Sequence, residues 1–178
     1  MYGQTVTFTA NVTAAGAPVT DGTTTFNDGL RILGTANVNS GVATLTSNGL
    51  TAGSHSITAV YNGNGNFNSS NDSLLQVVRK ANTKTVVTSS KNPSTSGQQV
   101  VFTAEVDAVA PGAGTPSGTV TFKDGNISLG TRSLNSSGIA TLVISSLSRG
   151  SHSITVVYNG SDSFNNSLSP SLSQVVQR

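Results

Sequence analysis

The two histidines of the chain, His55 and His152, are its best candidates for acid–base or metal chemistry, since cysteine is absent. Both end the same pattern, Leu-x-x-Gly-Ser-His, which begins at Leu50 and again at Leu147. A metal site or a general base needs further histidines or carboxylates that converge on the imidazole, and each copy of the pattern has one histidine. In β-sandwich folds such a corner commonly carries a tyrosine that bonds the backbone just upstream. We therefore predict a structural corner role for both imidazoles.

The acidic residues do not form a cluster that would hold calcium or support catalysis. Seven of them are scattered along the chain: Asp21, Asp28, Asp72, Glu105, Asp107, Asp124 and Asp162. A calcium site collects several carboxylate oxygens, whereas Asp28 and Asp124 are interpreted as turn residues of Asp-Gly turns. No Gly-x-Ser-x-Gly segment is present to carry a serine nucleophile. The sequence thus predicts no enzyme activity, no cofactor, and no catalytic, cofactor-binding or metal site.

The composition indicates an all-β chain with few charges. Charged residues make up 9% of the 178 residues and the formal net charge is +2. Nothing resembles the clustered basic face that neutralises a phosphate backbone, so we expect no nucleic-acid partner. No run approaches the ~18 apolar residues of a membrane helix, so no membrane insertion is expected in this segment. Ser, Thr, Asn and Gly dominate the polar positions, which favours half-buried strands joined by tight turns.

The chain contains two copies of one sequence unit. Three pairs of segments carry the match: 3–10 with 97–104, 22–29 with 118–125, and 53–58 with 150–155. The offset between the copies grows only between these segments, as expected for insertions in turns. A unit of roughly ninety-five residues is the size of one small domain. We therefore predict two domains, residues 1–80 and residues 81–178.

Alternation of apolar and polar residues predicts the strands of each domain. Val6, Phe8, Ala10 and Val12 share one face of the first strand, and threonines and Asn11 share the other. Thr-rich runs further along end in Asp-Gly, a strong hairpin signal. The pattern predicts two tandem immunoglobulin-like β-sandwiches of Greek-key topology, with about seven strands each. The predicted core residues are Phe8, Phe26, Ile57 and Tyr61, with their counterparts Phe102, Phe122, Ile154 and Tyr158.

The repeated phrases resemble those of the bacterial Ig-like repeat family. The units of that family run Gly-Gln-x-Val-x-Phe-Thr-Ala, Gly-Thr-Val-Thr-Phe-x-Asp-Gly, Leu-Gly-Thr, Gly-Ser-His-x-Ile-Thr and Val-Tyr-x-Gly. Both copies follow this pattern in the same order, with Thr24 in place of the valine of the second phrase in the first copy. The resemblance covers nearly the whole chain. It implies a secreted or surface-exposed bacterial protein whose domains are strung in arrays as stalks, adhesin shafts or spacers. The implied partners are neighbouring Ig-like repeats of the same protein, and no single binding activity is implied.

One predicted strand occurs in the second copy alone. The segment 83–90 reads as the first strand of the second sandwich, and no such segment precedes the Gly-Gln phrase of the first copy. Two explanations stay open, of which we favour the first: the sequence was cut from a longer array, or another chain supplies the strand. The second would make the chain a filament subunit. Other copies would then bind through the open edge of the first repeat.

The expected function is that of an extracellular or cell-surface stalk or spacer. A carbohydrate- or host-binding adhesin module is the alternative from another class. Sugar-binding modules often present aromatic platforms, yet the chain has no tryptophan, and Tyr2 is the one tyrosine outside the repeated core positions. The polar loops 62–66 and 159–165 remain as candidate sugar-binding segments.

Overall fold

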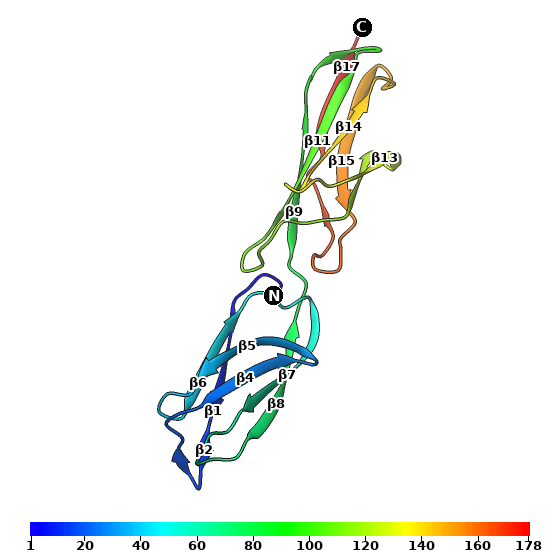
Figure 1. Ribbon diagram of the computed structural model, residues 1–178. Helices are drawn as coiled ribbons and strands as arrows, with labels where there is room; N and C mark the ends of the chain where they lie inside the picture. Colours follow the sequence, from blue (N-terminus) through cyan, green and yellow to red (C-terminus); the bar gives the residue numbers. More distant parts are fainter. The chain divides into compact units, whose positions relative to one another are not determined.

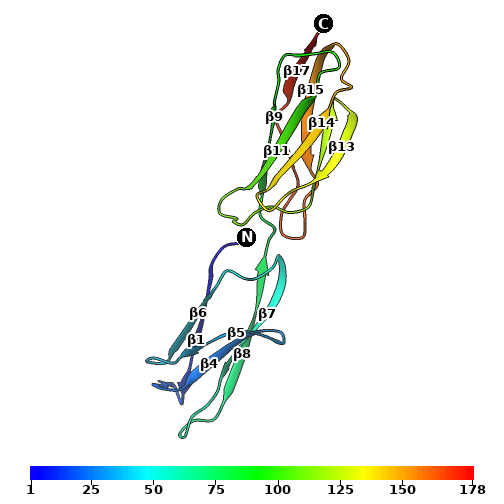
Figure 2. The ribbon, with the colours of Figure 1, turned by 45° about the horizontal axis from the view of Figure 1, so that its top comes forward.

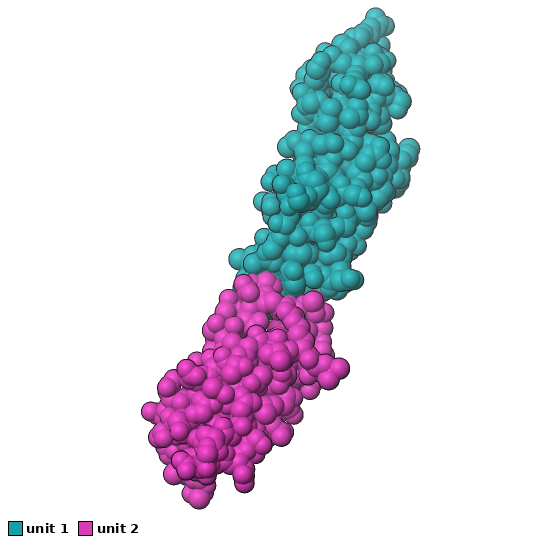
Figure 3. Space-filling view, viewed as in Figure 1, with its two compact units in different colours: residues 1–2, 80–178 teal, residues 3–79 magenta.

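The computed structural model describes all 178 residues, Met1–Arg178, and its regular elements are strands alone. The chain divides into two compact units (Figure 3). Gly3–Arg79 form one unit, here named the first repeat, and Lys80–Arg178 form the other with Met1 and Tyr2, here named the second repeat. The structure has no helix long and apolar enough to cross a membrane. The all-β class predicted from the sequence is confirmed.

The second repeat is a sandwich of two sheets (Figures 1 and 2). Its strands are β9 (Thr83–Ser89), β10 (Ser94–Thr95), β11 (Val100–Ala108), β12 (Thr119–Asp124), β13 (Ile127–Ser133), β14 (Ile139–Ile144), β15 (Gly150–Tyr158), β16 (Ser167–Leu168) and β17 (Leu172–Gln177). One sheet has the order β14-β11-β9, and the other has the order β10-β17-β15-β12-β13, with β16 paired to β15. The chain changes sheet five times: between β9 and β10, β10 and β11, β11 and β12, β13 and β14, and β14 and β15. The loops between these strands connect the two layers.

The core of the second repeat lies between these two sheets. Phe102, Phe122, Ile154 and Tyr158, all predicted as core residues, are 0% exposed. They belong to one apolar cluster. Along β11 buried residues alternate with more exposed ones, because successive side chains of a strand point to opposite faces.

The first repeat is also a sandwich of two layers, with six long strands. They are β1 (Val6–Asn11), β4 (Thr23–Asp28), β5 (Arg31–Asn37), β6 (Val42–Ser47), β7 (Gly53–Tyr61) and β8 (Ser70–Val78), with a small hairpin of β2 (Thr13–Ala14) and β3 (Ala17–Pro18). The pair β1-β6 forms one layer and β5-β4-β7-β8 forms the other. Between them, the predicted core residues Phe8, Phe26, Ile57 and Tyr61 are each at most 4% exposed. The rings of Phe8 and Phe26 stack with their centroids 6.5 Å apart.

The Asp-Gly hairpins form where the sequence predicts them, with one difference in detail. Asp28 is the last residue of β4 and pairs with Arg31 of β5, so the two loop residues are Gly29 and Leu30. Gly29 has a φ of 56°, in the left-handed region that glycine adopts without a steric penalty. The interpretation of Asp28 as a turn residue is therefore wrong by one position. The backbone of Asp28 belongs to the β4–β5 ladder, and its side chain contacts His55.

The two repeats differ at one edge of the sandwich. In the second repeat β9 pairs antiparallel with β11, and β10 pairs parallel with β17. In the first repeat β1 pairs with β6 alone, and β8 pairs with β7 alone. Strand β1 therefore has a partner on one side only, whereas β11 is paired on both sides. Ala104 of β11 is consequently 0% exposed, whereas its counterpart Ala10 of β1 is only half-buried.

We expect the first repeat to open at lower denaturant than the second. An unpaired strand edge and a partly exposed core both reduce the free energy of unfolding. Hydrogen exchange of the whole chain, followed by mass spectrometry of fragments from each repeat in urea, measures this difference. Amides of β4 and β7 should exchange about tenfold or more faster than those of β12 and β15. Equal protection in the two repeats would contradict the expectation.

Candidate functional site

Each histidine is held between a carboxylate and a backbone carbonyl. His55 Nδ1 lies 2.7 Å from Asp28 Oδ2, and its Nε2 lies 2.9 Å from the carbonyl oxygen of Thr51. In the second repeat His152 Nδ1 lies 2.6 Å from Asp124 Oδ2, and its Nε2 lies 2.8 Å from the carbonyl oxygen of Ser148. The bond to the carbonyl just upstream is the corner contact that the sequence suggested for these imidazoles. The carboxylate partner is a contact that the sequence analysis missed.

The strand register explains why the aspartate meets the histidine. Asp28 lies opposite Ile57 in the β4–β7 ladder, and His55 stands two residues before Ile57, on the same face of β7. The end of the β4–β5 hairpin is thereby joined to the start of β7. In both copies an aspartate occurs 27 or 28 residues before the histidine. That repeated spacing is the sequence signal that would have revealed the pair.

Both imidazoles are held in surroundings that favour their charged form. Each ring nitrogen faces an acceptor, and a neutral imidazole carries one proton for two such acceptors. Burial lowers the pKa of His55, but its bonds to Thr51 and Asp28 outweigh this effect and raise the pKa above the ordinary value of 6.5, even with Arg31 opposing. The bond to Ser148 is the main reason that the pKa of His152 is also raised, and the bond to Asp124 adds to it.

The histidine–aspartate pair of the second repeat does not have the arrangement of a catalytic triad. Serines 151, 153, 171 and 173 surround His152 in a shallow depression. A triad histidine must offer one ring nitrogen to the serine hydroxyl as an acceptor. Both nitrogens of His152 are already directed to Asp124 and to a carbonyl oxygen, while Ser153 bonds Ser171. The structure also contains no group of three or more histidines, cysteines or acidic residues placed to bind a metal ion.

The asparagine-rich loops use their amides within their own repeat. Asn62 donates to the hydroxyls of Thr23 and Thr25. Asn64 accepts bonds from two backbone N–H groups of the loop and donates to Asp21 at 2.6 Å. In the second repeat Asn159 repeats the contacts of Asn62 with two threonine hydroxyls. The amide side chains of these loops therefore form hydrogen bonds that hold the loops in shape and attach them to the neighbouring strands.

Tyr2, the aromatic residue outside the repeated pattern, is not a free platform. Its ring packs edge-to-face on Phe164 within the second repeat, with the centroids 5.3 Å apart and the ring planes at 77°. The two rings belong to the apolar cluster of that repeat. A flat aromatic surface for stacking on a sugar ring is therefore not provided by Tyr2.

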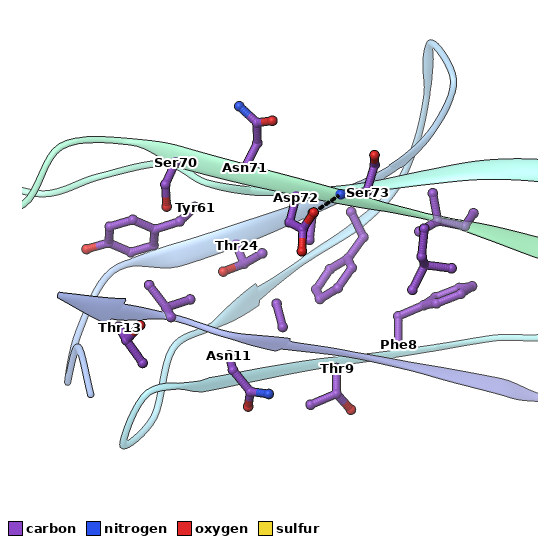
Figure 4. A pocket seen from close by; sticks show the side chains of 16 residues that line it. Phe8, Thr9, Asn11, Thr13, Thr24, Tyr61, Ser70, Asn71, Asp72 and Ser73 are labelled. Carbon is purple, nitrogen blue, oxygen red and sulfur yellow. Dashed lines mark hydrogen bonds between the residues drawn. The ribbon is translucent and has the colours of Figure 1, made fainter. Parts of the chain in front are cut away.

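An open groove of about 400 Å³ lies in the first repeat, along the edge without a leading strand (Figure 4). Its walls come from β1, β4, β7 and β8, and they include Phe8, Thr24, Tyr61, Ser70 and Asp72. The hydroxyl of Thr24 is buried and has no hydrogen-bond partner. Such orphans are rare in folded proteins, because a buried unpaired hydroxyl costs about 1–3 kcal/mol.

We expect both repeats to lose stability as the pH rises from about 6 to about 8. A histidine whose pKa is raised on folding adds stability that is fully present below its unfolded pKa and is lost as the pH passes its folded pKa. Asp124→Asn should flatten this dependence in the second repeat and lower its stability at pH 6 by roughly 1 kcal/mol or less. Urea unfolding followed by NMR signals of each repeat measures the effect. The first repeat of the same variant is the internal control, and an unchanged pH slope in the second repeat would refute the assignment.

Comparison with known proteins identifies the family. A family model described as a bacterial Ig-like domain (group 3) matches residues 1–79 and again residues 87–177. Similar solved structures include the fibronectin(III)-like modules of Clostridium thermocellum CbhA, with 14% identity, 98% of this chain and 86% of that chain covered, and a TM-score of 0.41. The D0-D1 domain of intimin is 18% identical, with 98% of this chain and 92% of that chain covered, and a TM-score of 0.36.

No curated protein matches the sequence significantly. The resemblance noted from the repeated phrases is confirmed by the family match, and the immunoglobulin-like class with it. The chain belongs to the bacterial Ig-like domain family (group 3), of which it contains two tandem copies.

Proposed function

We propose that the two repeats act as a stalk or spacer in an extracellular or cell-surface bacterial protein. The observation that carries this proposal is that the polar contacts present in both copies all join parts of the same sandwich. His55–Asp28 has its counterpart in His152–Asp124, as described above. In an array of repeats, stability is approximately the sum of each repeat's own stability and its contacts with its neighbours, so a framework of internal contacts in every copy supports a chain of self-supporting units.

Further duplicated contacts follow the same rule. The hydroxyl of Tyr61 donates to the carbonyl oxygen of Asp21, and that of Tyr158 donates to the carbonyl oxygen of Ser117. Each contact links β7 or β15 to the segment just before the neighbouring strand β4 or β12. Paired threonine hydroxyls between β4 and β5, and between β12 and β13, lie 3.1 Å apart in both copies. None of these contacts requires a ligand.

The second repeat also has a strand arrangement suited to bearing tension. Its short β10 and its last strand β17 are parallel, with Ser94 opposite Val176 and Thr95 opposite Gln177. Pulling the two ends of this repeat in opposite directions loads these bonds together in shear, and does not open them one at a time. The absence of cysteine leaves the fold independent of disulfides, and this supports the same role in any redox environment.

We expect two discrete unfolding steps when a single chain is stretched between handles at Met1 and Arg178 in optical tweezers. The second repeat should unfold at the higher force, because the parallel β10–β17 pair has no counterpart in the first repeat. Both steps should reverse when the force is lowered. Extension without discrete, reversible steps would remove the mechanical basis for a spacer.

A glycan array with the same chain tests the adhesin alternative. A spacer should give no saturable binding. Specific binding that is lost when Asn64 is replaced by alanine, and kept when the loop 159–165 is altered instead, would favour a sugar-binding module in its place.

A further inference from the structure

The chain contains four Asn-Gly dipeptides, at which the side-chain amide is open to attack by the backbone. The nitrogen of the residue that follows an asparagine can approach the amide carbon, and glycine leaves this approach open because it has no Cβ. The dipeptides are Asn48-Gly49, Asn62-Gly63, Asn64-Gly65 and Asn159-Gly160. Because the two residues are the same in each case, differences in reactivity between them come from the structure around them.

Three of these asparagines have their amide groups anchored. Asn62 donates from Nδ2 to the hydroxyls of Thr23 and Thr25, at 2.9 Å and 3.0 Å. Asn159 makes the same pair of contacts with two threonines, at 2.9 Å and 3.2 Å. Asn64 donates to a carboxylate at 2.6 Å and accepts from two backbone N–H groups, each at 2.8 Å. These hydrogen bonds must break before any of the three side chains can turn toward its glycine.

The side chain of Asn48 has no such anchor. Asn48 and Gly49 are both exposed, and they lie in the irregular segment between β6 and β7. The amide of Asn48 forms no hydrogen bond. The N–H of Gly49 makes one long contact, of 3.3 Å, with the hydroxyl of Ser47. A bond of that length is weak, and the hydroxyl oxygen is an acceptor for the proton that the nitrogen loses on attack.

The fold does not require an Asn-Gly dipeptide at this place. The Leu-x-x-Gly-Ser-His pattern aligns Leu50 with Leu147, so the counterparts of Asn48 and Gly49 in the second repeat are the serines at 145 and 146. The φ of Gly49 is outside the left-handed region, and a Cβ added there would meet no atom closer than 3.9 Å. A reactive dipeptide is therefore present in one copy of a corner that forms without it in the other.

We propose that Asn48 is a site of spontaneous deamidation and isomerisation, and that it reacts in the folded chain ahead of the other three dipeptides. The backbone nitrogen of Gly49 forms a bond to Cγ of Asn48. The bond from Cγ to the side-chain nitrogen breaks, and that nitrogen leaves as ammonia with the proton that Gly49 gives up. One water molecule then opens the cyclic imide at either carbonyl, which yields aspartate or isoaspartate. No oxidant or reductant takes part.

The products change the charge and the length of the chain at this corner. Either product adds a carboxylate beside Arg31, whose Nη1 lies 3.5 Å from the carbonyl oxygen of Gly49. Isoaspartate also adds one atom to the main chain just before Leu50, which is 4% exposed, and before Thr51, whose carbonyl oxygen faces His55. The proposal goes beyond the spacer function, because it assigns a modification site that acts on the first repeat alone.

The test is a time course of the whole chain in mildly alkaline buffer, followed by peptide mapping with mass spectrometry. Asn48 should deamidate about tenfold or more faster than Asn62, Asn64 and Asn159, because their hydrogen bonds add to the barrier. In water labelled with heavy oxygen, the product should carry one heavy atom. Isoaspartate and aspartate should both appear, since the imide opens at either carbonyl. In guanidinium chloride the four rates should become similar.

Two matched variants separate the chemistry from the fold. Gly49→Ala should slow the reaction at Asn48 about tenfold or more, because a Cβ hinders the approach of the nitrogen. Gly65→Ala, which also places its Cβ in open space, should leave the rate at Asn48 unchanged. Circular dichroism of both variants checks that the fold is kept.

A third variant tests the role of the anchoring hydrogen bonds. Thr25→Val removes one of the two hydroxyls that hold the amide of Asn62. The rate at Asn62 should rise, and the rate at Asn159 in the same chain is the internal control.

Three outcomes would overturn the proposal. They are equal rates at all four dipeptides in the folded chain, an unreactive Asn48 in the folded chain under conditions in which the unfolded chain reacts, and a product that is aspartate without isoaspartate. The stretching experiment uses freshly purified chain and is independent of all three, so the spacer function stands or falls separately.

Discussion

Closure of the sandwich edge by the leading strand is the constraint on which the packing of each repeat depends. A strand edge without a partner leaves N–H and C=O groups unpaired, and it leaves the apolar face beside it open to water. In the second repeat β9 removes both problems, because it pairs along β11 and buries Val87 in the core. The first repeat has the same inner faces without that strand. The unpaired edge of β1 explains three features of this repeat: the open groove, the exposure of Leu74 and the sparse contacts of Gln76.

The histidine–aspartate pair solves a second packing problem in both copies. The start of β7 or β15 and the end of the adjacent hairpin each present polar groups where the sheet ends. Asp124 bonds both the imidazole of His152 and the backbone N–H of Ser153, so one carboxylate serves two donors. The imidazole then reaches the carbonyl oxygen of Ser148. Since both ring nitrogens are occupied, the same geometry that stabilises the corner removes the basic nitrogen that catalysis would need.

The contacts that stabilise each sandwich lie within that sandwich. The duplicated tyrosine and threonine contacts, and the histidine–aspartate pairs, all join strands or loops of one repeat. A spacer relies on internal contacts of this kind, because each repeat then contributes its own stability.

The sequence by itself determined the class of the fold, its division into two copies, and the faces of the strands. Period-two alternation and duplication are local properties of a chain, so Phe8 and Phe102 were predicted as core residues and are buried. Only the tertiary structure decided that Asp28 meets His55 and that Gln174 meets Ser89, because strand pairing brings together residues that lie 27 and 85 positions apart. Side-chain partners across a ladder depend on register, and register is set by the packing of the whole sandwich.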